Sequence, residues 1–187
     1  MTEYSRGEAL ELLNKSISNP KMVAHSLASE AVLRALAKKL GRDVERWGIT
    51  GLLHDIDIDQ CEGDMCRHAN IGADMLLKLG FDEEIAETIR MHNESATNRS
   101  RSSEFEHALA AGETITGLIF ATAYVYPEKK ISVVKAKSVV KRMKEKSFAA
   151  SVRRENILEC EQIGIPLADF VQLSLDALTP IEVELGF

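Results

Sequence analysis

The stretch that organises the chain is Gly-Leu-Leu-His-Asp-Ile-Asp-Ile-Asp at residues 51–59. An imidazole and a carboxylate stand side by side at the end of an apolar, helix-patterned segment, and two further carboxylates follow. Neutral imidazole and carboxylate suit first-row divalent metals, and a buried charge is costly unless it is paired or coordinates a cation. The alternative is that His54 caps a helix C-terminus and that the aspartates form a turn. The doublet therefore directs attention to the other histidines and carboxylates.

Composition narrows the class of protein. A chain of 187 residues is long enough for one domain with a real core, and 45% hydrophobic with 28% charged residues is typical of a soluble globular protein. The formal net charge of -6 disfavours a nucleic-acid partner. The longest apolar run, at 117–126, is too short to span a bilayer, and no apolar signal region follows residues 1–8. Together with three cysteines that lack disulfide-scaffold spacing, this predicts a cytoplasmic protein with no membrane partner.

Periodicity predicts an all-α fold. Almost every periodic segment has helical spacing, and no strand-like alternation persists. We expect a single domain over residues 1–187, a helical bundle of about eight helices with its core at about 21–126 and C-terminal helices over 132–178. The expected helices lie at 5–17, 21–40, 43–56, 65–79, 82–92 and 103–126, with two or three shorter ones at 132–144, 151–163 and 166–178. The polar segment 93–103 is a lid or a mobile connection.

Four of the five histidines fall on stripes that face the predicted core. His25 shares a helical face with Val32 and Leu36, His68 lines up with apolar residues three, seven and eleven positions later, and His92 follows two isoleucines at helical spacing. Each one alone is more often a satisfied core or helix-end residue than a ligand. Several imidazoles on the inner faces of separate helices, however, would converge on one centre.

One carboxylate also stands on an apolar stripe. Glu113 shares a face with Leu109, Thr116 and Phe120, where an unpaired charge would cost several kcal/mol. His107 lies six residues before Glu113 and points well away from that face, so we interpret it as a surface residue. Glu113 is therefore the carboxylate expected to join the histidines.

The order His25, His54-Asp55, His68 and His92 resembles the HD-domain superfamily of metal-dependent phosphohydrolases, in its HDIG-type branch. Residues 52–57 match its signature apart from Asp57, where the named motif has glycine. Flanking segments at 24–27, 68–73, 92–93, 121–127 and 144–149 are also similar to small stand-alone members. The resemblance runs from about residue 21 to residue 178 and implies an HD-type helical bundle.

The resemblance implies a set of metal ligands. His25, His54, Asp55 and a later carboxylate would hold a first divalent ion. His68 and His92 would hold a second ion in a dinuclear site, with Asp55 bridging. The family closes its site with an aspartate ahead of a Thr-Gly pair, and Glu113 stands at that place here. We expect Glu113 to ligate in its stead.

Two further aspartates and two cations complete the candidate site. Asp57 and Asp59 are candidate catalytic residues with Asp55, as partners of the ligands or proton acceptors; the alternative is that they form a capped turn. Lys146 and Arg154 belong to a basic segment at 135–154 and coincide with recurrent family positions, so they are candidates to bind the substrate phosphate.

The resemblance and the ligand set predict hydrolysis of a phosphate ester. Nitrogen and oxygen ligands suit one or two ions of Mn, Fe, Co, Ni or Zn, which lower the pKa of a bound water. The expected enzyme is a phosphohydrolase that cleaves a small phosphate ester, a nucleotide or related phosphomonoester, by metal-activated water. One alternative is a catalytically decayed HD domain acting as a nucleotide-binding regulatory module, which the glutamate at position 113 would fit. A hydrolase acting on RNA or DNA is disfavoured by the net charge, although the basic segment would suit it.

Overall fold

The computed structural model describes residues 4–187, so the first three residues of the N-terminal stretch considered above lie outside the described part. Within it the chain is all-helical with no strand, which confirms the predicted fold class, and it has nine α-helices where about eight were expected. In the same residues three short 3-10 helices, η1 to η3, lie between α-helices, and a fourth, η4, follows the last one. The α-helices are α1 (Arg6–Ser16), α2 (Pro20–Leu40), α3 (Val44–Leu53), α4 (Asn70–Lys78), α5 (Glu83–His92), α6 (Glu104–Tyr124), α7 (Ala136–Arg142), α8 (Arg154–Leu158) and α9 (Leu167–Leu178).

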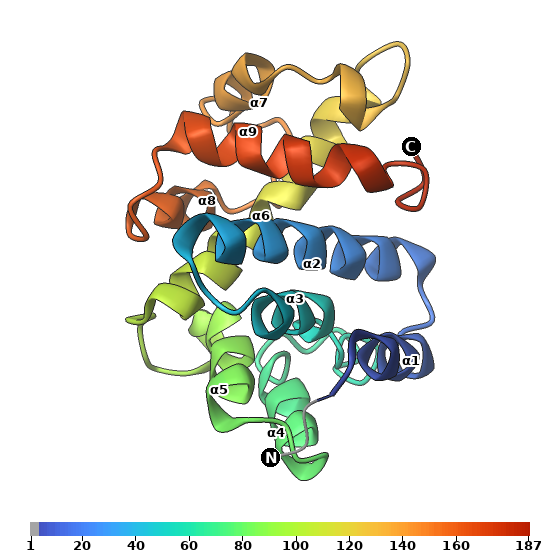
Figure 1. Cartoon of the computed structure of the whole chain (residues 1–187), viewed down its shortest axis with the longest axis vertical. Coiled ribbons are helices and arrows are strands. Elements are labelled where there is room, and N and C mark those ends of the chain that lie inside the picture. The colour runs from blue at the N-terminus through green and yellow to red at the C-terminus, as the bar shows by residue number, and fades with distance from the viewer. Residues whose placement is uncertain (1–3) are drawn as a thin grey trace.

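The long helix α2 lies at the centre of the bundle. It packs against α3 on one side and α9 on the other, with α6 crossing it (Figure 1). Helix α6 also contacts α5 and α8, so it joins the N-terminal and C-terminal helices. Its buried residues and those of α2 form the middle of the hydrophobic core. In residues 4–187, no helix has the length and apolar character needed to cross a bilayer.

Side-chain caps fix where most of the long helices begin. A cap oxygen accepts a hydrogen bond from a backbone N–H of the first turn, which would otherwise lack a partner. The capping residues are Ser5, Asn19, Asp43, Asp82 and Ser103. Because these side chains are visible in the sequence, the starts of five helices agree with the predicted ones to within a residue or two.

Two predicted helices are wrong at the ends next to the site. The helix expected at 65–79 begins only at Asn70, because Ala69 adopts a positive φ of 70° that no regular helix contains. His68 therefore lies in a turn before α4 rather than on its stripe. The helix expected at 43–56 ends at Leu53, and His54 is its C-cap. After His54 the chain continues in turns instead of a helix, so Asp57 and Asp59 reach different parts of the molecule.

Of the C-terminal helices, the one expected at 166–178 agrees with α9, but the other two are shorter than expected. The helix predicted at 132–144 is formed only over α7, and the one predicted at 151–163 is divided into α8 and η3 (Glu159–Glu161). The guanidinium of Arg154 donates to the carbonyl oxygens of Ala149 and Val152, at 2.7 and 2.6 Å. The carbonyl of Ala149 also accepts from the backbone N–H of Val152 at 3.0 Å, so the segment before α8 forms an irregular turn around the arginine and not a continuous helix.

We predict that Gly51→Ala destabilises the fold where α2 and α3 cross. A Cβ on Gly51 would lie 2.7 Å from the carbonyl oxygen of Ser29 and 2.9 Å from its carbonyl carbon, and backbone atoms cannot rotate away. The helices would have to separate, at an expected cost of about 1–3 kcal/mol in the free energy of unfolding. Urea unfolding of the metal-free protein measures this. Gly7→Ala is the matched control, since its nearest neighbour would be 3.9 Å away, and equal stability of the two variants would contradict the close crossing.

Candidate metal centre

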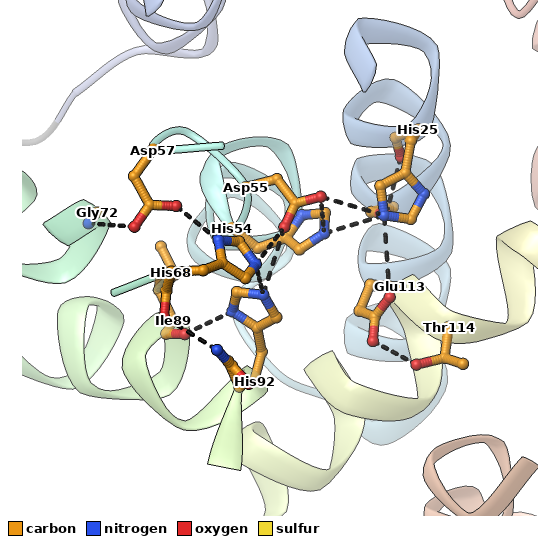
Figure 2. Close-up of polar contacts among 12 residues, drawn as sticks. His25, His54, Asp55, Asp57, His68, Gly72, Ile89, His92, Glu113 and Thr114 are labelled. Carbon is orange, nitrogen blue, oxygen red and sulfur yellow. Dashed lines mark hydrogen bonds and ion pairs between the residues drawn. The ribbon is translucent and has the colours of Figure 1, made fainter. Parts of the chain in front are cut away.

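Five segments of the chain bring their polar side chains to one place inside the bundle. His25 comes from α2, His54 and Asp55 from the end of α3, and His68 from the turn before α4. His92, the last residue of α5, lies next to His68, and Glu113 of α6 lies next to His25 (Figure 2). The six residues that the sequence suggested as metal ligands, four histidines with Asp55 and Glu113, therefore lie close together in space.

Asp55 stands between two pairs of imidazoles. Its Oδ2 lies 3.4 Å from Nε2 of His54 and 3.6 Å from Nε2 of His25. Its Oδ1 lies 3.2 Å from Nε2 of His68 and 3.3 Å from Nε2 of His92. Within each pair the two Nε2 atoms are 3.1 and 3.0 Å apart. Two groups that could hold a metal ion therefore share one carboxylate, which offers a different oxygen to each.

Backbone carbonyls determine the tautomer of one histidine in each pair. Nδ1 of His54 is 2.8 Å from the carbonyl oxygen of Gly51, and Nδ1 of His92 is 2.6 Å from that of Ile89. A carbonyl oxygen only accepts, so Nδ1 donates in both rings. In the neutral imidazole, Nε2 then carries a lone pair directed at Asp55.

Side chains determine the tautomer of the other two. Nδ1 of His25 is 2.9 Å from the hydroxyl oxygen of Thr116, whose own proton is donated to the carbonyl oxygen of Glu113. The hydroxyl therefore accepts from His25. Nδ1 of His68 donates to a carboxylate oxygen of Asp57 at 2.8 Å. Both rings thus also present Nε2 to the centre.

The donor set fits divalent cations. Four Nε2 atoms and two carboxylate oxygens face one another, and lone pairs about 3 Å apart repel unless a positive charge lies between them. Each imidazole is fixed by a hydrogen bond on its far nitrogen, as is usual for histidines that bind metal. Nitrogen and oxygen donors of this kind suit first-row transition metals.

The pKa values of these groups also indicate that the cluster favours a positive charge. Burial lowers the pKa of His54 to about 3, so this ring stays neutral. Burial also acts to lower the pKa of His68, but the carboxylates of Asp55 and Asp57 outweigh it and raise that pKa to about 10. Burial acts to raise the pKa of Asp55, and the surrounding histidines hold it well below its usual value. Without a metal, a proton on His68 supplies the positive charge that these carboxylates require.

Glu113 stands at the edge of the first group. Its Oε2 lies 3.8 Å from Nε2 of His25, and its Oε1 accepts a hydrogen bond from the hydroxyl of Thr114. Burial raises the pKa of Glu113 above its usual value, against the opposing effect of His25 and His92. A cation beside it would favour the ionised form.

The two aspartates after Asp55 have different surroundings. Asp57 is fully buried and accepts from His68 with one oxygen and from the backbone N–H of Gly72 with the other, at 2.8 Å each. Asp59 does not reach the cluster: its Oδ2 accepts from the backbone N–H and hydroxyl of Ser18 at the surface. The structure thus places Asp57 beside His68, which it can orient, and places Asp59 away from the cluster, against Ser18.

We predict that Asp57→Asn lowers the affinity for divalent metal roughly 10–100-fold, the usual effect of removing the partner of a ligating histidine. The amide is a weaker acceptor than the carboxylate, so His68 would lose basicity and orientation. Titration with Co²⁺ measures the affinity. Asp59→Asn should bind metal as the wild type does, because the Asp59 carboxylate bonds to Ser18 and, within residues 4–187, to none of the candidate ligands. Equal affinities of the two variants would remove Asp57 from the site.

A third group that could hold a metal contains Asp57, Cys61 and His68. Both oxygens of Asp57 and Nδ1 of His68 are already hydrogen-bonded. Burial and Asp57 raise the pKa of the Cys61 thiol to about 11, and a protonated thiol is a poor ligand. This group therefore supports His68 rather than forming a further site.

Asn93 is a site residue that sequence reasoning missed. Its amide donates to the carbonyl oxygens of Met65 and His68, at 2.7 and 3.1 Å, and so fastens the turn that carries His68 to the end of α5. The only sequence signal was its place directly after His92. Pairing across 25 positions of the chain leaves no periodicity to detect.

A cleft beside the metal centre is lined in part by the basic segment, but by neither of the two candidate phosphate-binding residues, Lys146 and Arg154. This cleft of about 240 Å³ is lined by His25 and Glu113 on the metal side and by residues 151–153 and Asn156 opposite. Its arginine is Arg153, not Arg154, whose guanidinium is held by the backbone carbonyls described above. Lys146 is exposed on the turn between α7 and α8. The structure thus places the neighbour of the expected arginine in the cleft.

With this geometry established, comparison with known proteins identifies the family. The HD-domain model matches residues 22–123, which is more than half of the chain. The chain belongs to the HD-domain family. All six candidate ligands lie within the matched residues, so the family assignment and the cluster describe the same part of the molecule.

Several curated proteins are similar over part of their length. A tRNA (cytidine(56)-2'-O)-methyltransferase of Thermoplasma volcanium is 31% identical over 44% of this chain and 24% of its own. Ribonuclease Y of Nitratidesulfovibrio vulgaris is 34% identical over 45% of this chain and 16% of its own. An uncharacterized protein, MJ0778, of Methanocaldococcus jannaschii is 34% identical over 46% of this chain and 52% of its own. The chain thus covers about half or less of each relative. No solved structure matches significantly.

Proposed function

We propose that this protein is a metal-dependent phosphohydrolase that cleaves a small phosphate ester, a nucleotide or related phosphomonoester. The observation that carries the proposal is the set of four inward-facing Nε2 atoms around the two oxygens of Asp55. A hydrophobic core does not need such a set, because a buried acceptor atom is normally paired with a hydrogen-bond donor and not with other acceptors. Membership of the HD-domain family, typically metal-dependent hydrolases, supports the same conclusion.

The proposed ligands form two sets that share Asp55. The first is His25, His54, Asp55 and Glu113, and the second is His68, His92 and Asp55. One or two ions of Mn, Fe, Co, Ni or Zn would suit these donors. Bound there, a divalent ion supplies Lewis acidity and lowers the pKa of a coordinated water towards 7. Asp55 and the hydrogen-bonded imidazoles contribute a rigid frame, since the far side of every ring is already fixed.

The cleft beside His25 and Glu113 is the proposed substrate site. Its volume of about 240 Å³ is below the range of roughly 300–1,000 Å³ usual for larger ligands, which favours a small ester. Arg153 and Asn156 line it and would donate hydrogen bonds to phosphate oxygens, the arginine with its charge. Lys146, exposed on the adjacent turn, is a further proposed phosphate contact.

One observation favours the second candidate, a regulatory module that binds a nucleotide without turning it over. Oε2 of Glu113 lies 3.8 Å from His25, and the side chain is longer than the aspartate that the family resemblance implies. A displaced carboxylate would leave the first ion less firmly held. The same cleft would then bind a phosphate ester but not cleave it.

Metal analysis followed by a substrate panel tests the proposal. We expect the purified protein to carry close to one or two equivalents of transition metal. It should hydrolyse at least one of a panel of mononucleotides and sugar phosphates, with a dinucleotide and a short RNA included because one relative is a ribonuclease Y. Protein that binds no divalent ion after supplementation would refute the enzyme. Bound metal with no turnover on any substrate would favour the regulatory module.

A further inference from the structure

A buried arginine lies behind the proposed metal centre. Arg101 precedes α6, and its side chain is only 5% exposed. Its Nη1 donates to the backbone carbonyl oxygens of Met91 and His92, at 3.0 and 3.3 Å. The last carbonyls of a helix have no partner within the helix, and a cation is favourable at this end. Arg101 therefore fixes the end of α5, the point from which His92 reaches the cluster.

The same guanidinium begins a chain of hydrogen bonds that ends at Glu113. Its Nη2 donates to the side-chain oxygen of Asn156 at 3.1 Å, and the amide of Asn156 donates to the hydroxyl of Thr114 at 3.3 Å. Thr114 in turn donates to Oε1 of Glu113, the link visible in Figure 2. Every bond runs in the same direction, from the cation to the carboxylate, and bonds aligned in this way polarise and strengthen one another.

Two acidic groups hold Arg101 in place for this role. Its Nε donates to the carboxylate of Glu159 at 2.9–3.0 Å, and its Nη2 lies 3.2 Å from a carboxylate oxygen of Glu94. His107 also bonds to Glu159, at 2.8 Å. A planar guanidinium with several partners is rigid. Its contacts to His92 and Asn156 are therefore defined in direction and not only in charge.

We propose that Arg101 is a positioning residue of the metal centre, acting on Glu113 through Asn156 and Thr114 and on His92 through the end of α5. The inference rests on the proposed metal site. Glu113 has one more methylene than aspartate and so one more torsion to restrain. With Oε1 bound by Thr114, the other oxygen is directed at His25. The chain of hydrogen bonds would thus hold the longer side chain in the orientation that ligation needs.

Thr114→Val tests the last link, because valine keeps the shape of threonine and removes only the hydroxyl. We expect the affinity for Co²⁺ to fall roughly 10–100-fold, as when the hydrogen-bond partner of a ligand is lost. The visible d–d spectrum of the Co²⁺-saturated variant should also differ from that of the wild type, which a purely structural defect would not cause. Thr122→Val is the matched control: it removes another buried hydroxyl from the same helix, bonded to the carbonyl of Leu118.

Arg101→Lys tests the start of the chain, since lysine keeps the charge but cannot form the fork of contacts. We expect a similar loss of Co²⁺ affinity. Thr114→Val should then cost less in the Arg101→Lys background than in the wild type, because the chain is already broken. Full additivity of the two losses would show that Arg101 does not act through Thr114 and would overturn the inference.

The outcomes separate this inference from the proposed function. A wild-type protein that takes up no Co²⁺ would refute the metal site itself. A wild type that binds Co²⁺, with Thr114→Val matching Thr122→Val in affinity and spectrum, would overturn the positioning role and leave the metal site standing. Unfolding temperatures of the metal-free variants, measured alongside, show whether a lower affinity is only a consequence of a less stable fold.

Discussion

Replacement of His54 or Asp55 by alanine is expected to abolish both metal binding and phosphate-ester hydrolysis. Asp55 gives one oxygen to each pair of imidazoles, so its removal deprives both proposed ions of a ligand. His54 is fully buried, and its Nε2 lies 3.4 Å from Oδ2 of Asp55 and 3.1 Å from Nε2 of His25, so its removal takes a nitrogen donor from the first proposed set. We expect turnover to fall at least roughly a thousandfold, which corresponds to about 4 kcal/mol of transition-state stabilisation.

Elemental analysis and the rate on the best substrate of the panel measure these effects. Asp176→Ala is a control for Asp55→Ala, since it removes an exposed carboxylate from α9, far along the chain from the site. The unfolding temperature of each metal-free variant shows whether the fold is kept. Wild-type metal content in a folded Asp55→Ala protein would contradict a shared ligand, and turnover without metal would contradict the proposed chemistry.

The parts of the site that the sequence predicted are those with local signals. His54 and Asp55 are adjacent, His25 and His92 lie on helical stripes, and helix starts are marked by capping side chains such as Ser103. Residues three or four positions apart lie on the same face of a helix, so the apolar neighbours of a histidine show which way its face points. The family resemblance then linked these local signals into one predicted ligand set.

The parts that escaped prediction depend on contacts between distant positions. Arg101 meets Asn156 across 55 positions, and Asn156 meets Thr114 across 42. Nothing in the local pattern of any of them indicates the others. The positive φ of Ala69 is likewise set by the contacts of its neighbours, since alanine has no intrinsic preference for that region. For this reason the helix expected from Met65 begins only at Asn70.

The cleft is lined by Arg153 instead of the expected Arg154, and this difference also depends on the fold and not on the local sequence. Both are arginines in one basic segment, and composition alone treats them alike. The backbone of the turn 145–152 decides between them, because its carbonyls converge on Arg154 and leave Arg153 at the cleft. The charge of the segment only suggests a phosphate-binding role, and the fold is needed to say which residue would fill the proposed one.

Glu113→Gln is expected to have the second largest effect, a loss of metal affinity of roughly 100-fold, or about 3 kcal/mol. The amide keeps the size of the side chain and can still accept from Thr114, so the change isolates the negative charge. That charge would balance a divalent ion bound beside His25, whose Nε2 lies 3.8 Å from Oε2 of Glu113. Titration with Co²⁺ and the rate on the best substrate measure the loss. Glu104→Gln is the matched control, on the same helix but paired with Arg42 at the surface.

Glu113→Asp separates ligation from mere charge. Shortening the side chain by one carbon–carbon bond, about 1.5 Å, withdraws the carboxylate from Thr114 and from the orientation that the hydrogen-bond chain imposes. We therefore expect aspartate to bind metal more weakly than glutamate here, although it is the residue that the family resemblance implies. Higher affinity and faster turnover in Glu113→Asp would mean that glutamate is a compromise, and would favour the regulatory module over the enzyme. A loss in both variants would instead mean that this bundle is built around the longer side chain.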